Sequence, residues 1–61
     1  MTGLDDQAYF SRRAAEERQR AKASADLAIA NAHLRLATEY ERRLQRARAT
    51  ETLAELASAG Q

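Results

Sequence analysis

Apolar residues recur at spacings of three and four along most of this chain, which is typical of one face of an α-helix. Between residues 27 and 44 they form two neighbouring stripes. At about 100° of rotation per residue, the two stripes share one broad side of a helix. The pattern therefore predicts a helix over residues 25–48. One stripe consists of Ile29, His33, Leu36, Tyr40, Leu44 and Ala47, and the other of Leu27, Ala30, Leu34 and Ala37.

A first helix is predicted over residues 5–22. Asp5 and Asp6 lie at its start, where carboxylates bind free backbone N–H groups and complement the helix dipole. Arg20 and Lys22 lie in its last turns, where the dipole favours cations. The apolar positions of this helix are Phe10, Ala14, Ala21 and Ala25, with Leu4, Ala8 and Ala15 adjacent.

The break between the two helices is predicted at residues 23–26. Ser24 is a favourable N-cap, and Asp26 then falls in the first turn of the second helix. Neither glycine nor proline lies in this segment, so one uninterrupted helix through Ser24 is the alternative.

The apolar pattern changes after Ala49. Leu53 and Leu56 do not continue the stripe that contains Tyr40 and Leu44, and Thr-x-x-Glu over residues 52–55 has the spacing of a capping box. Either a short third helix begins there and covers about 53–58, or the second helix continues and presents a different face.

The predicted fold is all-α and consists of a single small domain over residues 1–61. Its two helices form an antiparallel hairpin, to which the short third helix is a possible addition. Fifteen of the twenty-seven hydrophobic residues are alanine, the best helix former and a poor source of buried apolar surface. Four of these alanines, spaced by seven on each helix, allow a close approach of the two backbones. They are Ala14, Ala21, Ala30 and Ala37.

An antiparallel turn near Ser24 places Asp5 and Asp6 beside Arg42 and Arg43, and Tyr9 beside Glu39. The first helix is too thin to cover both stripes of the second. We therefore expect one stripe to pack inside the hairpin and the other to meet a second copy or another protein, most simply as two antiparallel hairpins in a four-helix bundle. The predicted core and interface residues are Phe10, Leu27, Ile29, Leu34, Leu36, Tyr40 and Leu44.

The net charge of +1 argues against a generic nucleic-acid-binding protein, in which a strong basic excess is expected. A local basic cluster on the second helix nevertheless supports an alternative function, that of a regulator associated with nucleic acid. The possible anion-binding residues are Arg42, Arg43, Arg46 and Arg48. Protein–protein interaction is the favoured function.

No catalytic, metal-binding or nucleotide-binding motif emerges from the sequence, so we expect no enzymatic activity and no cofactor. His33 is interpreted as a helix-surface or interface histidine bonded to a carboxylate or a backbone carbonyl. The alternative is a metal ligand, a base or a pH sensor, with two copies brought together in a symmetric dimer. The adjacent pairs Asp5–Asp6 and Glu16–Glu17 are interpreted as solvated charges. Tyr40 is expected to be half-buried, with Phe10 inside the hairpin and Tyr9 on a different side.

No apolar run approaches the length of about 20 residues that spans a membrane. The acidic start has no apolar stretch behind it, so neither a signal peptide nor a membrane partner is expected and the cytoplasm is the expected location.

The segment from Tyr9 to Arg43 carries Tyr-Phe-x-Arg-Arg-Ala, Glu-Glu-Arg and His-x-x-Leu-Ala-x-x-Tyr-Glu-x-Arg. This combination resembles a group of short, uncharacterised helical proteins of α-proteobacteria, in which the connecting turn often contains Asp-Pro. Here Leu27 follows Asp26 in place of proline. The resemblance implies a bacterial cytoplasmic helical hairpin and no known activity.

Overall fold

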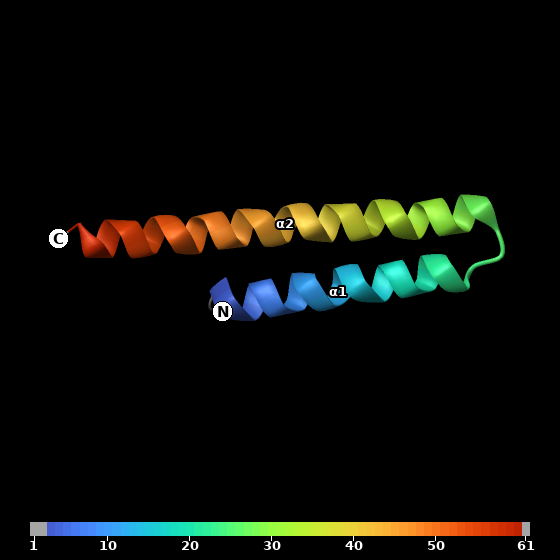
Figure 1. The fold of residues 1–61 in the computed structure, drawn as a ribbon, viewed down its shortest axis with the longest axis horizontal. Helices are drawn as coiled ribbons and strands as arrows, with labels where there is room; N and C mark the ends of the chain where they lie inside the picture. Colours follow the sequence, from blue (N-terminus) through green and yellow to red (C-terminus); the bar gives the residue numbers. More distant parts are fainter. Residues whose placement is uncertain (1–2, 61) are drawn as a thin grey trace.

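A computed structural model describes residues 3–60 of the chain, and over these residues it forms two long helices joined by a short turn. Helix α1 covers Gly3–Ala23 and helix α2 covers Leu27–Ala59. The helices run antiparallel, and α2 extends well beyond the start of α1 (Figure 1). The molecule measures 54 × 15 × 14 Å between its outermost Cα atoms, the shape of a rod. The predicted all-α hairpin is therefore confirmed.

The turn between the helices is organised by Asp26. Its carboxylate accepts hydrogen bonds from the backbone N–H groups of Ala28, at 2.8 Å, and Ile29, at 3.2 Å. Asp26 is therefore the N-cap of α2, and the prediction that Ser24 takes this position is wrong. The Ser24 hydroxyl instead contacts the backbone N–H of Asp26 at 3.3 Å. The break lies in the predicted segment, and the alternative of one uninterrupted helix is excluded.

Helix α2 continues without interruption to Ala59, so the predicted end near residue 48 and the separate third helix are wrong. The alternative prediction, in which the second helix continues past Ala49, is confirmed. No glycine or proline lies between residues 27 and 59, and nothing in the backbone forces a break. The hydroxyl of Thr50 donates to the carbonyl of Arg46 within the helix, at 3.0 Å. The N–H of Gly60 donates to the carbonyl of Leu56 at the C-terminal end.

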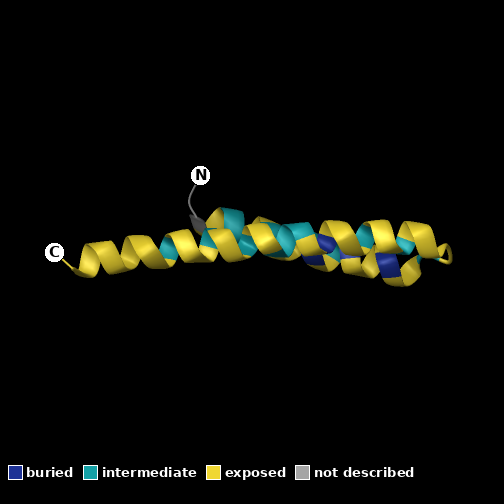
Figure 2. Cartoon of the chain, turned by 90° about the horizontal axis from the view of Figure 1, so that it is seen from above, coloured by how far each residue is buried: buried dark blue, intermediate teal, exposed yellow. Residues whose placement is uncertain are grey.

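The contact between the helices is made of small side chains. Ala14 and Ala21 of α1 and Ala37 of α2 are buried, and Ala30 is half-buried. The close approach predicted for these four alanines is confirmed, and burial is concentrated on the facing sides of the helices (Figure 2). One more buried residue lies on this line among the described positions, and it is charged: Glu17.

The large apolar residues of α2 lie mostly outside this contact. Leu27, Ile29, Leu34 and Leu36 are exposed, so the expectation that they form the hairpin core is wrong, and their role at an interface stays a prediction. The close approach made by the alanines leaves no room for leucine between the helices. The other predicted core residues, Phe10, Tyr40 and Leu44, are half-buried.

Candidate functional site

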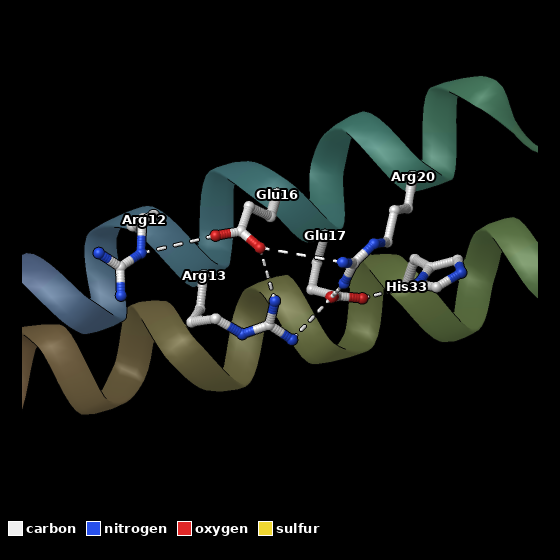
Figure 3. Close-up of polar contacts among 6 residues, drawn as sticks. All are labelled: Arg12, Arg13, Glu16, Glu17, Arg20 and His33. Carbon is white, nitrogen blue, oxygen red and sulfur yellow. Dashed lines mark hydrogen bonds and ion pairs between the residues drawn. The ribbon is translucent and has the colours of Figure 1, made fainter.

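Glu17 lies at the centre of the contact between the helices, with its side chain only 2% exposed. Its carboxylate accepts hydrogen bonds from three donors: Arg13 Nη2 at 3.1 Å, Arg20 Nη1, and His33 Nδ1 at 2.6 Å (Figure 3). Arg13 and Arg20 lie one turn before and after Glu17 on α1, whereas His33 comes from α2. The prediction that Glu17 is a solvated charge is therefore wrong.

Glu16 extends this cluster toward solvent. Its carboxylate lies 2.8 Å from Arg13 Nη1, 3.6 Å from Arg12 Nε and 3.9 Å from Arg20 Nη2. The guanidinium of Arg13 thus joins the two adjacent carboxylates (Figure 3). Glu16 itself is partly exposed, as predicted. Together these residues form an ion-pair network that begins at the surface of α1 and ends on α2. The network consists of Arg12, Arg13, Glu16, Glu17, Arg20 and His33.

The network keeps Glu17 ionised. The hydrogen bond from His33 lowers the pKa of the Glu17 carboxyl the most, and Arg20 lowers it further, against the opposing effect of burial. Hydrogen bonding to Tyr40 and then to Glu16 raises the pKa of Arg13. Among the described residues, no buried side-chain nitrogen or oxygen lacks a hydrogen-bond partner. The hydrogen bond between Glu17 and His33 therefore links α1 to α2. It also confirms the prediction that His33 bonds to a carboxylate.

Three aromatic rings close the hairpin next to this network. Tyr40 of α2 lies 6.3 Å from Tyr9 and 6.5 Å from Phe10, measured between ring centroids. The Tyr9 and Phe10 rings lie 5.6 Å apart, and Tyr9 is exposed whereas Phe10 is half-buried. The guanidinium carbon of Arg13 lies 5.3 Å from the Tyr40 ring centroid, a cation–π distance. The predicted half-burial of Tyr40 is confirmed.

The ion pair between Arg18 and Glu41 identifies one long side of the hairpin, because it joins α1 to α2. Helical spacing places Ser11 and Ala15 on the Arg18 side of α1, since they precede Arg18 by seven and three residues. Leu34 and Leu27 precede Glu41 by seven and fourteen residues and share its side of α2. We call this side the leucine flank; its members are Ser11, Ala15, Arg18, Leu27, Leu34 and Glu41.

The opposite side carries the ion-pair network. Arg13 lies over Tyr40, and Leu36 precedes Tyr40 by four residues, with Ile29 seven residues earlier. We call this side the network flank, and define it by Arg13, Arg20, Ile29 and Leu36. Leu34 and Leu36 therefore project from opposite sides of the alanine line of α2, although their exposure is the same, 46%.

The four arginines predicted to bind anions lie on α2 near the start of α1. Arg43 and Arg46 both approach Glu39 Oε1, at 3.3 and 3.6 Å. Arg42 and Arg48 form no ion pair within residues 3–60, and both are exposed. The predicted pairing of Asp5 and Asp6 with Arg42 and Arg43 is therefore not observed. The Tyr9 ring lies beside the ring of Tyr40, the neighbour of Glu39 in the sequence.

No family model, curated protein or solved structure matches the chain. Within the described range, residues 3–60, no helix has the length and apolar character needed to cross a bilayer. The same residues contain no group of three or more His, Cys, Asp or Glu side chains arranged to hold a metal ion.

Proposed function

We propose that this chain is a small helical protein–protein interaction module that works through the apolar side chains exposed on α2, with a second copy as its simplest partner. One observation carries the proposal: burial is inverted with respect to size. Small alanines and a carboxylate occupy the helix contact, while large side chains such as Leu34 and Leu36 remain at the surface. Such a module serves as an adaptor, a regulator or a subunit of a larger assembly.

The energetics of a short chain support this proposal. Full burial of a leucine stabilises a fold by about 1.5–3 kcal/mol. The exposed leucines of α2, from Leu34 and Leu36 at 46% exposure to Leu27 at 76%, forgo a large part of that gain in an isolated hairpin. Ordering each residue costs roughly 1.5 kcal/mol in conformational entropy. Small proteins commonly gain the missing stability from disulfides, bound metals or oligomerisation. Disulfides are not available here because the sequence has no cysteine. We propose that association covers the exposed leucines and supplies this stability.

Sedimentation equilibrium of the pure protein over a concentration series, with circular dichroism of the same samples, tests the proposal. We expect a dimer at micromolar concentration and a loss of helix on dilution, because folding and association are then coupled. A fully helical monomer over the whole series would contradict self-association. Capture of a different protein by that monomer through Leu34 or Leu36 would leave the interaction function standing with another partner.

The arginines of α2 favour a second candidate, a regulator that binds nucleic acid. Arg42 and Arg48 have no carboxylate partner within residues 3–60, whereas all four arginines of α1 are paired. Phosphate contacts by several arginines produce affinity that falls steeply with salt. A gel-shift titration with duplex DNA and with RNA at low and moderate salt tests this. Absence of any shift at low salt would eliminate the candidate.

A further inference from the structure

We infer that the second copy docks on the leucine flank, so that Leu34 of one chain lies over Ser11 and Ala15 of the other. This inference rests on the proposed self-association and specifies the surface that carries it. The two long sides of the hairpin offer different chemistry, and only one suits a contact between identical faces.

Shape favours the leucine flank. On this side α1 presents small exposed side chains, Ser11 and Ala15, and α2 presents the large exposed side chains Leu27 and Leu34. When two such faces meet, the leucines of one copy fit over the small residues of the other, as knobs fit into holes between packed helices. The same surface is then used twice, as a two-fold symmetric dimer requires.

Charge favours the same flank. Arg18 and Glu41 neutralise one another across the hairpin in the middle of this side, and the cations that share the side by helical spacing, Lys22 and Arg48, lie toward its two ends. The network flank brings the arginines that hold Glu16 and Glu17. Burying that network against an identical one removes several charges from water and places like charges near each other, which is unfavourable. A contact through the leucine flank therefore leaves the ion-pair network in water.

The available area suits a small interface between two copies. The two helices lie side by side over the length of α1, which has 21 residues and is about 31 Å long, so with a width of 15 Å this side offers on the order of 500 Å² per copy. Two copies then bury about 1,000 Å², near the lower limit for a specific interface. The short contact at the overhanging end of α2 offers only a fraction of that area, so a side-by-side arrangement is the one that meets the requirement.

Leu34 and Leu36 form a matched pair for the test, since they are the same residue type, equally exposed and on opposite flanks. Sedimentation equilibrium is measured for the wild-type protein, L34D and L36D. We expect L34D to weaken dimerisation on the order of 100-fold or more, and L36D to weaken it less than about 5-fold. The variants L34A and L36A repeat the comparison with a residue that favours helix, in case aspartate unfolds the chain.

Each outcome of this comparison decides a different point. A selective loss in L34D and L34A supports docking on the leucine flank. A selective loss in the Leu36 variants, or equal losses in both pairs, overturns the choice of flank and leaves self-association standing. A wild-type protein that is monomeric at every concentration overturns the proposed self-association and this inference with it.

Discussion

The carboxylate of Glu17 and the imidazole of His33 lie 2.6 Å apart and join α1 to α2, with the Glu17 side chain buried and the His33 side chain half-buried. Carboxylates are seldom buried without partners, and this one has three. Because alanine side chains are small and alike, a contact made of alanines does little to fix the axial register of one helix against the other. A buried polar contact supplies that information, as polar residues do at core positions of coiled coils. We therefore regard Glu17 as the residue that sets the register of the hairpin.

The substitution E17Q tests this role. Glutamine keeps the size of the side chain but removes the charge that holds Arg13, Arg20 and His33 together. We expect E17Q to lower the melting temperature at least twice as much as E16Q, because Glu16 is partly exposed and its loss leaves no buried group unpaired. Thermal unfolding followed by circular dichroism, at one fixed protein concentration, measures both variants. Equal decreases in melting temperature for E17Q and E16Q would contradict the role of Glu17 in setting the register.

Acid unfolding offers a second test of the same carboxylate. The pKa of Glu17 is lowered in the folded protein, with His33 as the main cause. Its contribution to stability is therefore complete above the pKa of a glutamate in the unfolded chain, about 4.3, and is lost as the pH falls through the lower folded value. We expect the wild-type protein to lose stability below about pH 4, and E17Q to lose less over the same range. Urea unfolding at a series of pH values measures the difference.

The sequence was sufficient to predict the two helices, their antiparallel packing and the alanine contact, because these depend on local propensity and helical spacing. It was not sufficient to predict the burial of Glu17, since adjacent acidic residues were treated as one solvated pair. The signal was present: Glu17 lies three residues after Ala14 and four before Ala21, on the line that faces α2. Glu16 is one residue out of phase and remains partly exposed.

The packing of α2 shows a different limit. Its apolar stripes predicted a core of leucines, but the narrower line through Ala30, His33 and Ala37 occupies the contact. The apolar pattern of α2 does not indicate which of its sides faces α1. The small residues of α1 favour a close contact, and a close contact selects the alanines of α2 over its leucines. The N-cap was likewise misplaced by two residues, because Ser24 and Asp26 are both favourable caps.

Enlarging the alanine contact should separate the helices. Ala37 is 1% exposed, so A37L places a large side chain in the buried contact between the helices. Such overpacking costs about 1–3 kcal/mol of unfolding free energy. The control A32L makes the same change at an exposed position of α2 and should remain within about 0.5 kcal/mol of the wild type. Urea unfolding compares them, and a stable A37L protein would contradict the close contact.

The cap of α2 is also open to measurement. Removing the Asp26 side chain in D26A leaves the N–H groups of Ala28 and Ile29 without their acceptor. We expect a loss of about 0.5–2 kcal/mol, while D26N, which keeps an acceptor oxygen, should lose much less. If Ser24 were the true cap, S24A would be the more damaging change and D26A nearly neutral. Chemical unfolding of the three variants distinguishes the two assignments.

The overhanging end of α2 should contribute little to the hairpin or to the proposed dimer. Leu53 and Leu56 lie beyond the start of α1 and are 67% and 64% exposed. Since alanine and leucine have similar helix propensities, the double variant L53A/L56A should keep its helix and change the unfolding free energy by no more than about 0.5 kcal/mol. Its dimerisation should also match the wild type, because the leucine flank is intact. A strong loss of dimer in this variant, measured by sedimentation beside L34A, would place the contact between copies at the end of the rod.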